Sequence, residues 1–293
     1  MRDLLARISD LSGYVLSNGR RLTGGEQGGA LLAESPVGPV VVKFQPDPEK
    51  AARVLAAARV MKATQAKWSV ADWLAVGPLG DGAFHVQEFV QGAILDVSKN
   101  AQVDAVIGAN RRQKGLAVAG AYDHSAQIVA VTMDRHPWFG GVARRSQAGA
   151  RVAADARSLV AVAGTVELPS DDIVHGDLSA SNIIVTPTGE SRFVDAESVG
   201  RGHRALDLAD LYRQCVISGH APETVFRRLT VAGVSASGSA AFITLVVGAC
   251  LNNLAWHAAN RSLPQFEHMC SRAQRVFHRV EGDCEAVEHC PSQ

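Results

Sequence analysis

The chain has 293 residues, 47% of them hydrophobic, which is enough for one large domain or two small ones with a proper core. Its 29 basic and 29 acidic residues balance, so no net field draws in nucleic acid or an anionic membrane, and we expect neither as a partner. The charges scattered through residues 1–7 also predict that no secretory signal is present.

Residues 12–45 contain short apolar runs separated by glycine-rich turns, which is typical of antiparallel hairpins. The richest turn contains Gly24, Gly25, Gly28 and Gly29. These glycines could cover the phosphates of a nucleotide or simply permit a tight turn, because glycine tolerates positive φ. No Gly-Lys-Ser/Thr follows them, so the turn is not a P-loop.

A helix is predicted to begin at Asp47, because this residue can cap it, Pro48 fits the first helical position and Glu49 places an acid in the first turn. The helix should run to about Ala66. More short strands are expected between residues 74 and 90. The rest of the chain is predicted to be mainly helical, with helices at about 101–119, 142–163, 205–218, 238–259 and 264–280.

One of these predicted helices requires a membrane check, because no charged residue occurs between Arg228 and Arg261. The densest apolar run, residues 240–251, is much shorter than the roughly 20 residues that a membrane span needs. Two asparagines follow it directly. We therefore predict a buried helix.

The most informative segment lies between the helices. Residues 175–182 read HGDLSASN, and residues 193–197 read FVDAE. Asp177 and Asn182 fall in a polar turn between apolar runs, and Asp195 comes at the end of the next apolar stretch. In phosphoryl transfer, one carboxylate accepts the proton of an attacking hydroxyl, while an amide oxygen and a second carboxylate hold Mg²⁺ against the phosphates of ATP.

The spacing H-x-D-x-x-x-x-N, with an aspartate at the end of the next hairpin, resembles the aminoglycoside phosphotransferase family, distant relatives of the protein kinases. The resemblance implies that Asp177 contacts the substrate hydroxyl and that Asn182 and Asp195 bind Mg²⁺. Asp207 resembles the downstream aspartate that braces the catalytic loop. His175 is expected to fix this loop through hydrogen bonds to the backbone.

Motifs upstream extend the resemblance over roughly residues 20–260. Lys43, which ends a run of three valines, looks like the strand lysine that contacts the nucleotide phosphates. The adenine would then meet backbone groups at Glu88 and Val90, in the hinge between two lobes. In the family, a glutamate on a helix usually pairs with this lysine. Glu49 is the candidate for that glutamate here.

Several of these residues also have a simpler structural explanation. Lys43 could be a charge that protects an edge strand from aggregation. Glu49 could serve only as a helix-start acid, and Asp207 could be an ordinary helix cap. A metal hydrolase built on His175 and its neighbours is disfavoured, because such sites gather several His and carboxylate ligands from separate segments.

The resemblance implies an α+β, protein-kinase-like fold with two lobes. We expect residues 1–91 to form a nucleotide-binding lobe with an antiparallel sheet and one helix. Residues 92–293 should form a mainly helical lobe that contains the catalytic loop, the metal site and the substrate cleft. A protein kinase itself is disfavoured, because only a few residues separate Asp195 from the next predicted helix, which leaves little room for an activation loop.

The expected function is transfer of the γ-phosphate of ATP, with Mg²⁺, to a hydroxyl group of a small molecule. The family resemblance makes an antibiotic such as an aminoglycoside the leading acceptor, with resistance by modification. However, residues 101–170 contain 8 Lys/Arg and 5 Asp/Glu, whereas a pocket for a polycation should gather carboxylates. A kinase of a sugar or amino alcohol is therefore an alternative, as is a pseudoenzyme that only binds nucleotide.

The cysteines are five in number and all lie in the C-terminal third of the chain: Cys215, Cys250, Cys270, Cys284 and Cys290. An odd count without a signal peptide predicts reduced thiols in a cytoplasmic protein. The last two lack a second pair at zinc-finger spacing. The sequence does not define an oligomeric state.

Overall fold

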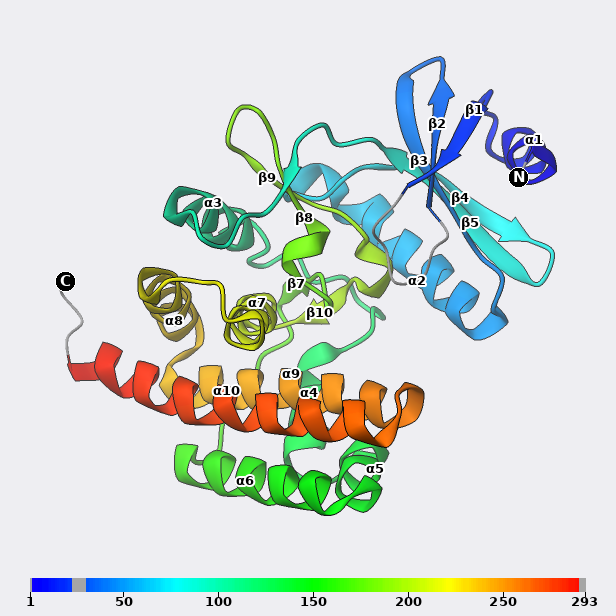
Figure 1. Ribbon diagram of the computed structural model, residues 1–293. Helices are drawn as coiled ribbons and strands as arrows, with labels where there is room; N and C mark the ends of the chain where they lie inside the picture. The colour runs from blue at the N-terminus through cyan, green and yellow to red at the C-terminus, as the bar shows by residue number, and fades with distance from the viewer. Residues whose placement is uncertain (1, 23–29, 290–293) are drawn as a thin grey trace.

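A computed structural model describes residues 2–22 and 30–289 of the chain (Figure 1). An antiparallel sheet with a helix packed on it lies at the N-terminal end, and stacked long helices form the opposite end. Short hairpins lie between these two parts. This is the two-lobed α+β architecture that the sequence predicts. The turn with Gly24, Gly25, Gly28 and Gly29 lies outside the described residues, so its proposed contact with phosphates stays a prediction.

The N-terminal sheet has five strands in the order β1-β2-β3-β5-β4, and each neighbouring pair is antiparallel. The strands are β1 (Ser17–Arg21), β2 (Ala30–Ser35), β3 (Gly38–Gln45), β4 (Trp73–Leu79) and β5 (Gly82–Glu88). Because β3 is the central strand, Lys43 on it cannot be the charge of an edge strand. That simpler explanation of the lysine is therefore wrong.

Helix α2 (Pro48–Thr64) packs on one face of the sheet against β4 and β5. Its start agrees with the prediction, since the Asp47 side chain accepts a hydrogen bond of 2.9 Å from the backbone of Lys50. A 3-10 turn, η1 (Gln65–Lys67), extends it close to the predicted end. The other face of the sheet buries Phe84 and Val86 against helix α1 (Arg2–Ser12), which the sequence analysis did not predict.

The C-terminal part is mainly helical, as predicted. Its helices are α3 (Asn100–Arg111), α4 (His124–Thr132), α5 (Pro137–Arg145), α6 (Gln147–Ala163), α7 (Ala205–Ser218), α8 (Glu223–Ser237), α9 (Ser239–Asn260) and α10 (Leu263–His289). Three boundaries differ clearly from expectation, and one of them is the end of α10, which continues to His289 instead of stopping at about 280. Helix α3 stops at Arg111 instead of continuing to 119, because the chain turns through Gly115 and Gly120 at positive φ. Ser146 separates α5 from α6, since its side chain caps α6 through a bond from Gly149.

Helix α9 is the only helix in the described ranges that is long and apolar enough to cross a membrane by length and composition. Its most apolar window is 61% buried inside the protein. Helices α4, α5, α6, α7, α8 and α10 all contact it. This packing matches the prediction of a buried core helix.

Short strands between the helices carry the predicted catalytic loop. Strand β7 (Asp172–Val174) pairs with β10 (Gly200–Gly202), and β8 (Ile183–Val185) pairs with both β6 (Ala93–Ile94) and β9 (Ser191–Phe193). Two 3-10 turns flank this hairpin: η2 (Ala180–Asn182) directly precedes β8, and η3 (Ala196–Ser198) follows β9. The predicted motif residues therefore lie in the turns that adjoin these short strands.

The four cysteines in the described part of the chain are free thiols, and all four are buried in helices α7, α9 and α10. Burial raises the pKa of Cys215, Cys250 and Cys284 to about 12 and that of Cys270 to about 11. This agrees with the predicted reduced state for these four. Cys290 lies outside the described residues.

Candidate active site

Lys43 connects the sheet to the motif that follows β9. Its ammonium group forms ion pairs with Asp195 and with Glu197, the latter at 3.3 Å. Burial alone would lower the pKa of Lys43, but the two carboxylates outweigh this effect and raise it. Lys43 therefore keeps its positive charge, as a phosphate-binding group must.

The expected pairing of Lys43 with Glu49 is absent. Glu49 is exposed in the first turn of α2, and in the part of the chain that the structure describes Lys43 pairs only with Asp195 and Glu197. A position in the first turn suits a negative charge for a different reason, because the helix dipole is positive there. The helix-start explanation of Glu49 is therefore the better one, and its assignment as a nucleotide-site residue is wrong in this structure.

Asp195 and Asn182 lie on adjacent segments, since the backbone of Val194 donates a 2.9 Å hydrogen bond to the carbonyl of Asn182. Asp195 adopts a left-handed conformation with φ of 63°, which non-glycine residues seldom adopt except at turns and functional sites. The pKa of Asp195 would be raised by burial, but Lys43 beside it lowers the pKa below the ordinary value. Asp195 is thus held as a carboxylate.

The donor set fits a hard divalent cation. The side-chain nitrogen of Asn182 donates to the carbonyl of Asp177 at 2.9 Å, which leaves its amide oxygen without a partner among the described residues. Asp195 adds a carboxylate, and Mg²⁺ prefers such oxygen ligands together with phosphate oxygens. In the same described ranges, no group of three or more His, Cys, Asp or Glu side chains is placed so that it could hold a metal ion.

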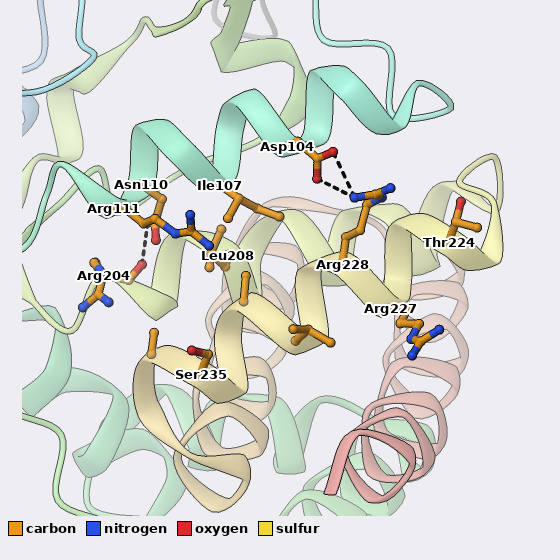
Figure 2. Close-up of a pocket in the computed structure, with 13 residues that line it drawn as sticks. Asp104, Ile107, Asn110, Arg111, Arg204, Leu208, Thr224, Arg227, Arg228 and Ser235 are labelled. Atoms are coloured by element: carbon orange, nitrogen blue, oxygen red, sulfur yellow. Dashed lines mark hydrogen bonds and ion pairs between the residues drawn. The ribbon is translucent and has the colours of Figure 1, made fainter. Parts of the chain in front are cut away.

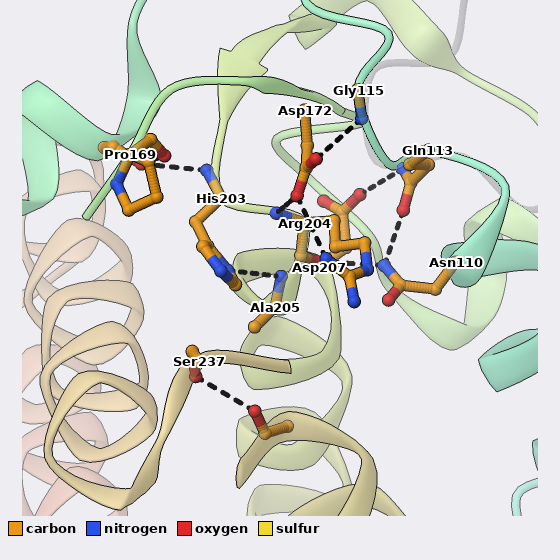
Figure 3. Close-up of polar contacts among 12 residues, drawn as sticks. Asn110, Gln113, Gly115, Pro169, Asp172, His203, Arg204, Ala205, Asp207 and Ser237 are labelled. Carbon is orange, nitrogen blue, oxygen red and sulfur yellow. Dashed lines mark hydrogen bonds and ion pairs between the residues drawn. The ribbon is translucent and has the colours of Figure 1, made fainter. Parts of the chain in front are cut away.

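Asp207 braces the catalytic loop from α7, as Figure 3 shows in part. Its carboxylate accepts hydrogen bonds from the backbone N–H groups of His175 and Gly176 at 2.9 and 3.1 Å, and from Gln113 at 2.6 Å. Asp207 is fully buried and makes no cap bond, so it is not an ordinary cap. The ring of His175 bonds the carbonyl of Val194 at 2.8 Å, which confirms the predicted role of this histidine.

Asp177 projects from this braced loop to solvent. The surrounding chain still reduces its hydration, and this raises the pKa of Asp177 above the ordinary value of 3.8. Asp195 and Asp207 raise it further, whereas His175 opposes the shift. A carboxylate with a raised pKa is a better proton acceptor than an ordinary aspartate.

Gly176 is required next to Asp177 because its φ is +80°. A Cβ atom here would lie 2.5 Å from the ring of His124 and 2.7 Å from the carbonyl of Ser198. His124 in turn bonds that carbonyl at 2.9 Å. The backbone beside Asp177 is thus packed between α4 and η3.

The hinge differs in detail from the prediction. The backbone N–H of Glu88 already donates to the carbonyl of Asp72 at 3.0 Å, so only its carbonyl could meet an adenine. The Glu88 side chain pairs with Arg192 of β9. Val90 follows β5, and no hydrogen bond involving its backbone occurs within the described residues, so both of its groups suit the predicted contact.

Three residues with contacts at the candidate site were not predicted: Glu197, Gln113 and Asp172. For Glu197, the available sequence signal was its position two residues after Asp195. Gln113 supports Asp207, and Asp172 accepts bonds from Gly115 and Arg204 (Figure 3). Neither of these had a sequence signal, because their partners are distant in the chain.

A cavity of about 440 Å³ lies between α3, α7 and α8 (Figure 2). Four arginines line it: Arg111, Arg204, Arg227 and Arg228. Arg228 forms an ion pair with Asp104 at 2.8 Å. Leu208 faces this cavity, whereas its neighbour Asp207 faces the catalytic loop, so the cavity lies behind the loop and contains none of the predicted site residues.

Comparison with solved structures identifies the fold. A thermostable mutant of aminoglycoside phosphotransferase APH(4)-Ia, in its apo form, has a TM-score of 0.68 at 14% identity, covering 95% of this chain and 98% of that one. An aminoglycoside phosphotransferase from Alicyclobacillus acidocaldarius gives 0.62 at 17%, covering 99% and 97%. Choline kinase LicA from Streptococcus pneumoniae gives 0.64 at 14%, covering 96% and 98%. At these identities, the likeness establishes the protein-kinase-like two-lobed fold alone.

No curated protein sequence matches this chain. The family model described as the phosphotransferase enzyme family, however, matches residues 19–232, which is well over half of the chain. The match includes Lys43, the loop with Asp177 and Asn182, and Asp195. With the fold and the site in agreement, the chain belongs to the phosphotransferase enzyme family and is a phosphotransferase that acts on hydroxyl groups of small molecules.

Proposed function

We propose that this enzyme transfers the γ-phosphate of ATP, as its Mg²⁺ complex, to the hydroxyl group of a small molecule. The observation that carries the proposal is the meeting of Lys43 with Asp195, beside the loop that presents Asp177 and Asn182. These groups come from separate parts of the chain and supply the charges that phosphoryl transfer needs. ATP use also agrees with two related structures, an APH(4)-Ia mutant in complex with ADP and hygromycin B, and LicA in complex with AMP.

Each residue has a defined part in this proposal. Lys43 would hold the α- and β-phosphates, and Asn182 and Asp195 would hold Mg²⁺, which neutralises charge on the phosphates when bound. Asp177 would orient the acceptor hydroxyl and take its proton late, because a loose transition state asks little of a strong base. The carbonyl of Glu88 and the backbone of Val90 would receive the adenine.

The leading acceptor is an antibiotic such as an aminoglycoside, which would make the enzyme a resistance factor. The APH(4)-Ia mutant whose structure contains hygromycin B supports this acceptor class. A second candidate, an amino alcohol or another small metabolite, is supported by the comparable likeness to the choline kinase LicA. The excess of basic residues over residues 101–170 also favours an acceptor with less positive charge than a polycationic antibiotic.

The test is Mg²⁺-dependent ATP consumption with a panel of aminoglycosides, other antibiotics, sugars and amino alcohols, with Asp177→Ala as the control. Stimulation by one acceptor that disappears in Asp177→Ala would support the proposal and identify the acceptor class. Tight ATP binding with no turnover across the whole panel would favour the nucleotide-binding pseudoenzyme. Turnover that persists in Asp177→Ala would contradict the role of this residue.

We also propose that the enzyme is cytoplasmic, because the four described thiols are free and ATP is the proposed donor. Cell fractionation followed by immunodetection tests this location. Recovery of the protein outside the cytoplasm would contradict it.

A further inference from the structure

Helix α2 does not supply the acidic partner that fixes the phosphate-binding lysine in kinase-like enzymes. Glu49 is the only acidic residue in α2, and it is exposed. The buried face of the helix is apolar and consists of small or aliphatic side chains, beginning with Ala51 and Val54. Lys50, in the first turn, presents a positive charge that acts on Glu197. A partner for Lys43 must therefore come from another element.

The structure assigns that role to Glu197: we propose that this glutamate of η3 is the positioning residue for Lys43, and the inference rests on the function proposed above. Glu197 Oε1 lies 3.3 Å from the ammonium group of Lys43. The two side chains are mostly covered, with 20% of Lys43 and 28% of Glu197 exposed. A partly buried pair of this kind can hold one side-chain geometry more firmly than an exposed pair.

Asp195 also contacts Lys43, but its proposed role is to bind the metal ion. Among the described side chains, Glu197 forms no ion pair other than the one with Lys43, although the charge of Lys50 also acts on it. A lysine has a flexible four-carbon stem and a compact charge, so it benefits from a fixed acidic neighbour when it must reach a phosphate. Glu197 can keep this contact while Asp195 is engaged elsewhere.

The position of Glu197 in the same turn as Asp195 affects how movements of α2 reach the site. The segment from Asp195 to Glu197 contacts α2 and carries both the proposed metal ligand and the lysine partner. The lysine and the metal site are therefore positioned by one short turn, and a shift of α2 alone does not pull the partner away from Lys43. In an enzyme with a helical glutamate, by contrast, the helix position controls this pair.

The experiment is a double-mutant cycle on ATP affinity, measured by calorimetry on the full-length protein with Mg²⁺ and again with EDTA. It uses Glu197→Gln, Lys43→Ala and the double variant, with Glu190→Gln as the matched control on an exposed turn. We expect Glu197→Gln to weaken ATP binding about fivefold, both with Mg²⁺ and with EDTA, because Lys43 loses its position. In the Lys43→Ala background the same change should cause no weakening, and Glu190→Gln should have no effect.

Other results would overturn the inference. Weakening that occurs only with Mg²⁺ and persists in the Lys43→Ala background would make Glu197 a metal ligand. Tighter ATP binding in both backgrounds would mean that Glu197 acts only as a repelling charge. Failure of the wild-type protein to bind ATP at all would overturn the proposed function itself, which the first titration reveals before any variant is compared.

A second variant distinguishes loss of the contact with Lys43 from a general loss of folding. Glu197→Asp keeps the negative charge but shortens the side chain by one methylene, so it should lose the 3.3 Å contact and also weaken ATP binding. Circular dichroism melting should show folded protein for this variant and for Glu197→Gln. If Glu197→Asp binds ATP as the wild type does, the pairing geometry has no role and the inference is wrong.

Discussion

Asp177 is exposed to solvent, and its pKa is nevertheless raised because the surrounding chain reduces its hydration. The proposed role requires its ionised form, which accepts the proton of the acceptor hydroxyl. Since the pKa lies above 3.8, activity should begin to fall at a higher pH than an ordinary aspartate would produce. The acid side of the pH profile therefore reports on this residue.

We predict that, in a plot of log kcat against pH, the wild type falls with a slope of one on the acid side. This acid limb should be absent from the residual activity of Asp177→Asn. The same variant should reduce kcat by about 100-fold or more, because general-base contributions are of this size, while nucleotide affinity is retained. Steady-state kinetics across pH, with calorimetry for ATP, measure both. An unchanged acid limb in the variant would assign the titration to another group.

Asp195 yields a second prediction at the same scale. Asparagine also tolerates the left-handed conformation, so Asp195→Asn should fold with nearly unchanged stability. It loses the carboxylate, however, and should lose the Mg²⁺-dependent gain in ATP affinity. Titrations with Mg²⁺ and with EDTA measure that gain, and its full survival in Asp195→Asn would remove this residue from the metal site.

Most residues of the site were predictable because the motif is local. Asp177 and Asn182 are five positions apart, and Asp195 follows after one hairpin, so their order along the chain implies their proximity. Glu49 was the error, since a pairing across two elements depends on how α2 is rotated. Rotation depends on packing of the apolar face, which a count of acids cannot show.

At the scale of elements, α7 is the support of the catalytic loop. Asp207 lies in its first turn and accepts two backbone hydrogen bonds from the loop. Asp207→Ala should leave these buried groups unsatisfied and lower the free energy of unfolding by about 3 kcal/mol, with a loss of most activity. Urea denaturation measures this, with the exposed Asp81→Ala as a control expected to change stability by less than about 0.5 kcal/mol. Equal effects of the two variants would refute the bracing role.

The same helix contains Asp210, whose pKa burial raises to about 7, although Arg213 opposes the shift. The unfolded chain loses this proton near pH 3.8, whereas the folded protein retains it until about pH 7. The folded state therefore binds more protons in this window, and the free energy of unfolding should fall as pH rises through it. Relative to Asp210→Asn, the wild type should lose stability between about pH 5 and about pH 7. Denaturant titrations at both pH values test this, and a constant difference would contradict it.

Helix predictions succeeded where a local signal exists. The cap at Asp47 and the long apolar run of α9 are examples. Helices α4 and α8 were missed, and the end of α5 was merged with α6 into one predicted helix at about 142–163. The end of α3 was placed too late, since the helix ends at Arg111 and the chain then turns through Gly115, whose positive φ the apolar pattern does not reveal.

At the scale of the whole molecule, the fold was predictable from the order of the motifs. A strand lysine, a hinge, a catalytic loop and a metal segment follow one another in the order that resembles the phosphotransferase family, and this resemblance implied the two-lobed fold. The packing of α1 against the sheet was not predictable in this way. Its residues belong to no motif, and their role is to bury the outer face of the sheet.

All four described cysteines lie in helices of the C-terminal part, so the rate at which their thiols react reports how often these helices open. The buried thiols of α7, α9 and α10 have raised pKa values, so few thiolates exist near neutral pH, and a reagent must wait for a helix to open. We predict four slowly reacting thiols in the native protein, all of which react fast in denaturant, as measured by mass spectrometry with a maleimide. Fast native reaction of any of the four would contradict the burial.

The N-terminal sheet and α2 contain no cysteine, so the rate of thiol labelling does not report the opening of that lobe. Slower labelling on addition of ATP would therefore measure how far a ligand bound at Lys43 stabilises helices that it does not touch. The unmodified chain thus offers a direct measure of energetic communication between its two lobes.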